Sequence, residues 1–196
     1  RQNTAPAARP NVLLILADDM NDYGLLEQYP GVRIPNLRKF RESALTFEKA
    51  YCASPVCVPS RAAVFSGLFP HTTGAYLNGS DPWTKAPLND TESLPELFRR
   101  SGYITFGRGK IFHAPLPDER EKNMWQNEYW GGGFGPWPPE KDQVLGKFWG
   151  HTAWEGPDSD FPDVVNADEL IRFLEQRHTE PFFAVYGLWR PHTPFT

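Results

Sequence analysis

Two runs of apolar residues dominate the pattern of hydrophobic and polar positions along this chain. The first, from Asn11 to Ala17, ends abruptly at two aspartates, and the second, Phe182–Gly187, leads into a proline-rich ending. A shorter run, Tyr103–Phe106, lies between them. Continuous apolar runs of this length are typical of strands that are buried on both faces, as in a parallel or mixed sheet. The pattern therefore predicts an α/β fold with these strands at its centre.

Apolar residues at helical spacing follow the first predicted strand. A helix is expected to open at Pro35-Asn36 and to pack one face against the body of the protein. That face comprises Leu37, Phe40, Ala44 and Phe47. Residues 47–53 are then expected to return to the sheet.

Two further helices are predicted beside the later strands. The first begins after Ser93, where Glu96 completes a capping-box pattern, and ends at Gly102. The second begins at Asp163, and its apolar side is formed by Val164, Ala167, Leu170, Ile171 and Leu174.

Residues 114–162 show no period of two or of 3.6 residues, and five of the seven tryptophans lie there among glycines and prolines. We expect a long ordered excursion without regular elements, and nothing in it indicates a separate domain. Exposed aromatic side chains in this excursion could stack on sugar rings and help to select a substrate. An aromatic plug that packs the loop onto the body is the alternative interpretation.

Composition excludes several classes of function. A net charge of -4, spread along 196 residues, gives no basic surface for nucleic acid. No apolar run approaches the length of a transmembrane helix, and two cysteines are too few for a disulfide scaffold. Residues 1–10 are polar and rich in proline and alanine, which predicts a flexible N-terminal segment. Such a segment suits a chain after removal of a signal peptide, and an artificial N-terminus would look the same.

Polar residues follow directly after the predicted strands, where open α/β sheets bind ligands. Asp18 and Asp19 end the first strand, and two adjacent carboxylates repel each other unless a cation lies between them. Oxygen ligands of this kind suit Ca²⁺ or Mg²⁺. A solvated Asp-Asp turn is the other interpretation of the pair.

A second polar stretch surrounds one of the two cysteines. Residues 54–61 read Ser-Pro-Val-Cys-Val-Pro-Ser-Arg, and the residues that follow are compatible with a helix that stops at Gly67. Cys57 would then lie at a helix N-terminus, with Arg61 about one turn away, and both features favour an anionic group. From its neighbours alone, Cys57 could equally be a buried small residue or one half of a disulfide with Cys52.

The third polar stretch, Gly107-Arg108-Gly109-Lys110, has the Gly-Lys pair of a phosphate-binding loop. That interpretation fails because Ile104 occupies the position of the required earlier glycine and Ile111 replaces the serine or threonine. Two histidines follow strands in the same way: His113 lies three residues after Lys110, and His192 lies in the ending Arg-Pro-His-Thr-Pro-Phe.

These stretches together resemble the sulfatase family. The Cys-x-Pro-Ser-Arg pattern at Cys57 matches its first signature, although Val58 and Ser66 differ from the commoner residues there. The stretch from Gly102 to His113 resembles its second signature, and the spacing of His113 and the segment around His192 are similar to those of iduronate-type sulfatases. The resemblance implies a central mixed, largely parallel sheet flanked by helices, as in the alkaline-phosphatase-like superfamily.

What the resemblance implies for chemistry is hydrolysis of a sulfate ester, with a sulfated carbohydrate as the expected substrate. In that family the cysteine is converted by a formylglycine-generating enzyme to formylglycine, whose hydrate attacks sulfur. By the same resemblance, Asp18, Asp19 and position 57 would bind a divalent cation, usually calcium, with magnesium possible. Arg61 and Lys110 would hold the hydrate and the sulfate oxygens. His113 would serve as base, and His192 as sulfate ligand or acid.

The resemblance covers residues 11–196 but only the N-terminal part of a typical sulfatase. Further cation ligands of the family have no counterpart before Thr196, so we expect a fragment or processed chain that has little activity without the remaining C-terminal part. An exported protein, whether secreted, periplasmic or lysosomal, is expected. Two alternatives stay open: a phosphodiesterase or phosphonate hydrolase of the same superfamily, and a catalytically silent sulfatase-like chain that binds glycans.

Overall fold

The computed structural model describes residues 9–21, 31–79, 82–113 and 116–196. Its centre is a three-stranded sheet of β1 (Val12–Ala17), β2 (Ile104–Gly109) and β3 (Phe182–Leu188), in the order β1-β3-β2. Both strand pairs are parallel, so every described strand runs in the same direction, whereas the resemblance implied a mixed, largely parallel sheet. Most of the flexible segment expected over residues 1–10 lies outside the described residues.

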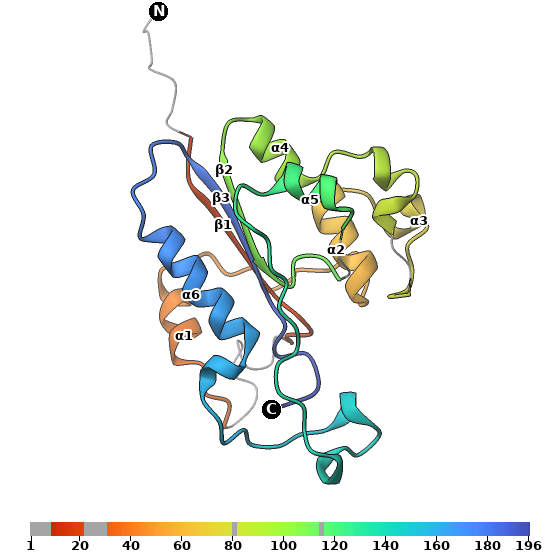
Figure 1. Ribbon diagram of the computed structural model, residues 1–196, viewed down its shortest axis with the longest axis vertical. Helices are drawn as coiled ribbons and strands as arrows, with labels where there is room; N and C mark the ends of the chain where they lie inside the picture. The colour runs from red at the N-terminus through yellow and green to blue at the C-terminus, as the bar shows by residue number, and fades with distance from the viewer. Residues whose placement is uncertain (1–8, 22–30, 80–81, 114–115) are drawn as a thin grey trace, which may run out of the picture.

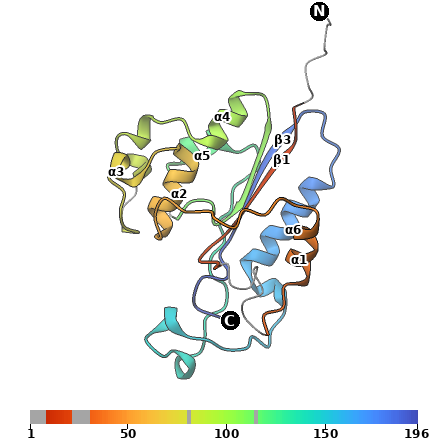
Figure 2. The same ribbon diagram turned by 180° about the vertical axis from the view of Figure 1, so that it is seen from behind.

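Helices cover the sheet on two sides (Figures 1 and 2). One layer contains α2 (Cys57–Ser66), α3 (Pro70–Thr73), α4 (Leu94–Arg100) and α5 (Asp118–Met124). On the other side α6 (Pro162–Leu174) packs against β2 and β3. Short 3₁₀ turns occupy Pro82–Thr84, Leu88–Asp90, Glu140–Asp142, Lys147–Trp149 and Asp158–Asp160.

The central strand β3 is buried on both faces, as its apolar run predicted. Phe183 and Val185 face a cluster that includes Phe65 of α2, and Ala184 and Tyr186 face a second cluster formed with α6. The apolar side of α6 differs from the predicted one. Ile171 is 50% exposed, while Phe173 is buried. The side of α6 that faces the sheet is therefore rotated away from Ile171 and toward Phe173.

The prediction for β1 is correct in position and wrong in burial. Alternate residues such as Leu14 and Leu16 pack against the first cluster, but Leu13 and Ile15 are 41% and 55% exposed. The reason is topological: β1 pairs only with β3, and no described helix packs against its outer face.

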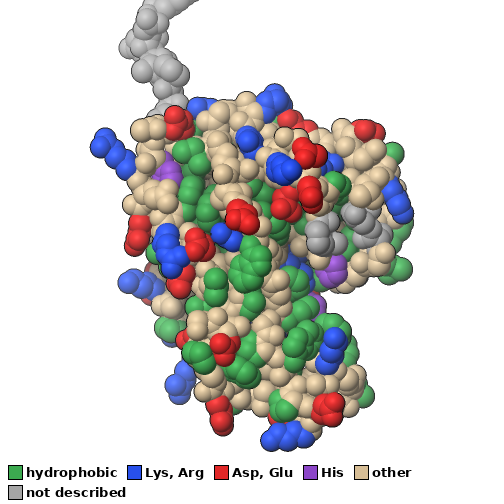
Figure 3. Space-filling model, viewed as in Figure 1, with side chains coloured by type: hydrophobic (Ala, Val, Ile, Leu, Met, Phe, Trp, Pro, Cys, Tyr) green, Lys and Arg blue, Asp and Glu red, His purple; other side chains and the backbone are tan. Residues whose placement is uncertain are grey.

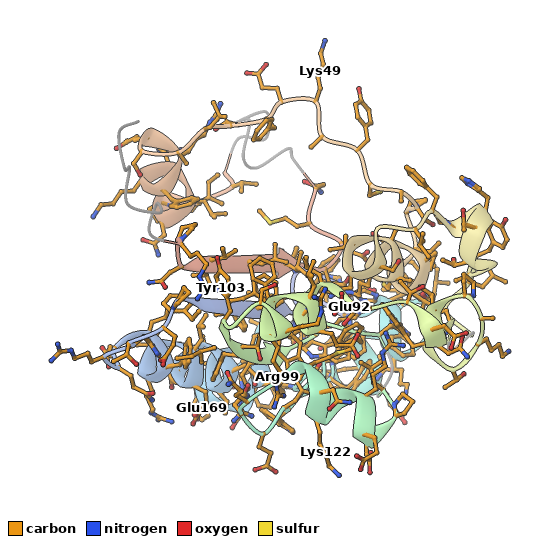
Figure 4. The ribbon with its side chains drawn as sticks, turned by 90° about the horizontal axis from the view of Figure 1, so that it is seen from above. Lys49, Glu92, Arg99, Tyr103, Lys122 and Glu169 are labelled. Carbon is orange, nitrogen blue, oxygen red and sulfur yellow. The ribbon has the colours of Figure 1, made fainter. Side chains whose placement is uncertain are left out.

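The helix α1 (Pro35–Glu42) also departs from prediction. It ends before Ala44, none of its residues is buried, and Phe40 is 68% exposed. Residues 47–53 form no strand. Figure 4 shows α1 and the segment that carries Lys49 standing apart from the sheet and its helix layers.

Residues 114–162 are mostly irregular, as expected, but the prediction that they contain no regular element is wrong. The segment begins with α5, whose Met124 is completely buried against the core. The later part forms a separate lobe beside the carboxyl ends of the three strands (Figure 1, teal). The excursion therefore lies next to the edge where the candidate site residues gather.

Candidate active site

The site is assembled from residues that directly follow strand ends. Ala17 pairs with Leu188 and Gly109 pairs with Gly187, so the parallel register places Asp18, Lys110 and Trp189 at one edge. A Cβ on Gly187 would overlap the backbone of Lys110, and Gly109 has a positive φ of 78°. Only glycine permits so close an approach of the two backbones. These two glycines thus set the position of Lys110.

Cys57 begins α2, as the sequence indicated, and Gly67 ends that helix in a left-handed conformation. The free thiol is buried, with its Sγ 3.8 Å from Asp18 Oδ2 and 3.9 Å from Lys110 Nζ. The disulfide alternative is excluded because Cys52 is free and exposed. In a protein carrying formylglycine, this Sγ marks the place of the aldehyde or hydrate oxygens.

Asp18 and Lys110 form a buried ion pair at the centre of the site. Lys110 is completely buried, and its ammonium also lies 4.6 Å from the ring of Trp189 and 5.4 Å from that of Phe134. Burial by itself raises the pKa of Asp18, but the hydrogen bond and charge of Lys110, together with Arg61, outweigh it and lower that pKa. Asp18 is therefore held as a carboxylate.

The guanidinium of Arg61 forms hydrogen bonds with other groups of the protein. It donates to the backbone carbonyls of Lys110 and Ile111, and its Nη2 lies 3.0 Å from Asp18 Oδ1. These contacts tie α2 to the loop after β2 and to the end of β1. The guanidinium thus positions both partners of the central ion pair.

The cysteine thiol itself is poorly suited to act as a nucleophile. Burial is the largest influence on Cys57 and raises its pKa; the charge of Lys110 opposes this and those of Asp18 and Asp19 add to it. A thiol with a raised pKa remains protonated and weakly reactive near neutral pH.

Both predicted histidines lie at this edge. His192 Nε2 is 3.4 Å from Asp19 Oδ2, and its Nδ1 hydrogen-bonds the carbonyl of Thr193 at 2.6 Å. The Nδ1 of His113 is buried and lacks a hydrogen-bond partner among the described residues. Burial, followed by the charge of Lys110, lowers the pKa of His113, so its imidazole stays neutral to a lower pH than usual.

The carboxylates at this edge suit a hard divalent cation, whereas the thiol of Cys57 does not. Asp18, Cys57 and His192 each offer one ligand atom, and these atoms lie within 4.8 Å of one another. Asp19, 56% exposed and in a left-handed conformation with φ of 56°, adds a second carboxylate beside His192. Carboxylate oxygens are the preferred ligands of Ca²⁺ and Mg²⁺. Because Lys110 and Arg61 also bind Asp18, its oxygens would be shared with a cation.

A cleft of about 450 Å³ opens beside these groups. Asp18, Asp19, Cys57 and Arg61 line it together with the loop that contains Cys52.

Sequence reasoning missed four residues that support the site. Asp163, at the start of α6, accepts hydrogen bonds from the backbone N–H groups of Trp189 and Arg190. Arg190 in turn donates to the carbonyls of Phe134, at 2.8 Å, and of His192, at 3.2 Å. Trp189 directly follows β3, and that position was an available signal. Phe134 lies in a segment without sequence periodicity, so no sequence pattern marked it as part of the site.

Comparison with known proteins gives this arrangement a family. The sequence model of the sulfatase family matches residues 10–196. The chain belongs to the sulfatase family. A sulfatase of Formosa agariphila is 35% identical over 211 residues, covering 95% of this chain and 40% of the relative. Human iduronate 2-sulfatase is 27% identical over 205 residues, covering 94% of this chain and 36% of the relative.

The fold is likewise that of solved sulfatase structures. A structure described as BT4656 in complex with its substrate D-glucosamine-2-N,6-O-disulfate aligns with a TM-score of 0.65 at 21% identity. That alignment covers 94% of this chain and 35% of the solved one. This sulfatase-family chain thus spans well under half the length of the relatives it matches.

Proposed function

We propose that the protein hydrolyses a sulfate ester of a sulfated carbohydrate, with formylglycine derived from Cys57 as the source of the nucleophile. The observation that carries the proposal is the position of Cys57, buried at the positive end of α2 between Asp18 and Lys110. Family membership supports the reaction class, and the names of the relatives support sulfate esters. The substrate of the solved relative is a sulfated sugar.

Formylglycine resolves the difficulty posed by the raised pKa of the thiol. Conversion by a formylglycine-generating enzyme during maturation replaces the protonated thiol with an aldehyde, whose hydrate supplies a hydroxyl group to attack sulfur. The Cys-x-Pro-Ser-Arg pattern from Cys57 to Arg61 is what such an enzyme would recognise.

The contacts of the remaining side chains support the roles that the resemblance implies for them. Lys110 places a buried positive charge 3.9 Å from Cys57 Sγ, where it can stabilise negative charge on the sulfuryl oxygens. Arg61 holds Asp18 and the backbone of Lys110, so in this structure it acts through them. His113, neutral and without a hydrogen-bond partner for Nδ1 among the described residues, is suited to accept a proton. His192 is suited to bind sulfate or to protonate the leaving oxygen.

A divalent cation, Ca²⁺ or Mg²⁺, would be held by Asp18, Asp19 and the oxygens of formylglycine at position 57. Bound there, it would polarise the ester and favour ionisation of the attacking hydroxyl. We also propose that the remaining C-terminal part of a sulfatase, in the same chain or as a second one, completes the site, because Ca²⁺ takes six to eight oxygen ligands.

Export from the cytoplasm is proposed as well, whether to a periplasm, a lysosome or the medium. The likeness to human iduronate 2-sulfatase and human N-acetylgalactosamine-6-sulfatase supports it. No helix of the described residues has the length and apolar character needed to cross a membrane.

The proposal is tested on the protein together with the remaining C-terminal part of a sulfatase, matured with a formylglycine-generating enzyme and assayed on matched aryl sulfate and aryl phosphate esters. We expect preferential hydrolysis of the sulfate ester and loss of that activity in Cys57→Ala. Preferential hydrolysis of the phosphate ester would instead favour a phosphodiesterase or phosphonate hydrolase. A matured protein that binds sulfated sugars without hydrolysing them would be a glycan-binding relative.

A further inference from the structure

The lobe formed by the excursion carries a lysine without a counter-ion among the described residues. Lys147 Nζ lies 5.0 Å from the ring centre of Trp137 and 5.4 Å from that of Phe148. Within the described ranges Lys147 forms no ion pair, although the acidic residues Glu140 and Asp142 precede it in the same lobe. Two aromatic rings thus hold a positive charge that no described carboxylate neutralises.

The two rings remain accessible from outside. Trp137 is 36% exposed and Phe148 is 42% exposed, and the two pack edge to face with their centres 5.1 Å apart. Figure 3 shows hydrophobic and basic side chains together on this lobe, at the lower end of the molecule. A partly exposed aromatic pair beside a cation presents the two features that bind an anionic sugar: an apolar surface for the ring and a charge for its substituent.

This aromatic pair is joined to the active site by a single residue. The ring centre of Phe134 lies 5.4 Å from that of Trp137 and 5.8 Å from that of Phe148, and 5.1 Å from that of His192. The Arg190 guanidinium binds the carbonyls of Phe134 and His192. The distance between the lobe and the catalytic edge is therefore fixed by packing and hydrogen bonds.

We propose that Lys147, Trp137 and Phe148 form a second subsite, which binds an anionic group on the sugar next to the one whose sulfate ester lies at Cys57. The substrate class that fits both sites is a glycan with negative charges on neighbouring sugars. This inference rests on the proposed function and deepens it. The ammonium of Lys147 pairs with a sulfate or carboxylate of the neighbouring sugar, and the exposed ring surfaces contact its apolar face.

Binding is measured first, in the Cys57→Ala protein, so that hydrolysis does not interfere. The probes are a disaccharide with one sulfate on its terminal sugar and a matched disaccharide with a second sulfate on the neighbouring sugar. By calorimetry, the second sulfate is expected to strengthen binding about tenfold, the size of one charge-assisted contact at a partly exposed site. Lys147→Gln should remove this gain and leave the affinity for the monosulfated probe unchanged.

Two variants serve as controls. Lys147→Arg keeps the charge and should retain the gain, and Lys141→Gln removes a neighbouring lysine of the same lobe and should also retain it. Trp137→Ala should weaken binding of both disaccharides, because it removes part of the ring surface.

The subsite is overturned if Lys147→Gln leaves the gain intact, if it weakens both probes equally, or if neither probe binds. Failure of the subsite proposal can be distinguished from failure of the proposed function. Binding with the expected preference but no hydrolysis by the matured protein would contradict the function and support the subsite. Hydrolysis without a preference for the second sulfate would support the proposed function and contradict the subsite.

Discussion

Cys57 is buried, and Cys52, which lines the same cleft, is exposed. Burial raises the pKa of the Cys57 thiol, so in the unmodified protein it should react slowly with an alkylating reagent. We expect Cys52 to be labelled first and Cys57 much more slowly in the folded protein, as read from the masses of the two peptides. Cys52 serves as an internal control in every molecule. Equal labelling rates in the folded protein would contradict the described environment of Cys57.

His113 provides a pH-dependent prediction. Because burial and the charge of Lys110 lower its pKa in the folded protein, the unfolded chain binds a proton at this residue more readily. The free energy of unfolding should therefore fall as the pH decreases below 6.5, the ordinary value for histidine, and through the folded pKa. Urea unfolding at a series of pH values should show a smaller decrease for His113→Gln than for the unsubstituted protein.

The residues of the site were more predictable than their contacts. Asp18 and Lys110 could be placed because each follows a strand, and the ends of parallel strands meet at one edge. Direct pairing of Lys110 with Asp18 could not be foreseen, because it depends on the close approach of β2 and β3. The contact of Phe134 with Lys110 and His192 was equally beyond reach, because tertiary packing alone places it.

At the scale of elements, the carboxyl ends of β2 and β3 carry the strongest steric constraint on the site. A Cβ at Gly187 would overlap the backbone carbonyl of Lys110. Gly187→Ala should therefore lower the free energy of unfolding by about 3 kcal/mol, because the strands must separate or the loop that holds Lys110 must move. Gly133→Ala is the matched control, since no atom lies within 4 Å of its added Cβ, and should change stability by less than about 0.5 kcal/mol. A Gly187→Ala protein of unchanged stability would contradict the described packing.

Apolar runs identified the strands but not their neighbours. The run at β3 corresponds to a strand buried on both faces, whereas the equally apolar run at β1 has one face partly exposed in the described protein. A run of apolar residues reports what a strand is able to bury, and its position in the sheet decides what it does bury. The same reasoning applies to α1, whose helical spacing was recognised although none of its residues is buried.

At the scale of the whole molecule, the fold gathers the proposed site around one residue. The sulfatase match covers residues 10–196, and the fold brings Asp18, Lys110 and the N-terminus of α2 together around position 57. The central claim is therefore that this position carries formylglycine in the mature protein.

Mass spectrometry of the peptide that spans position 57 tests this claim most directly. The protein should come from its native host, or from a host that supplies a formylglycine-generating enzyme, with Cys57→Ala as a control whose side chain cannot be oxidised to the aldehyde in this way. We predict a peptide that has lost one sulfur and two hydrogens and gained one oxygen relative to cysteine, and that reacts with a hydrazide as an aldehyde does. An unmodified thiol at position 57 in such a preparation would contradict the account.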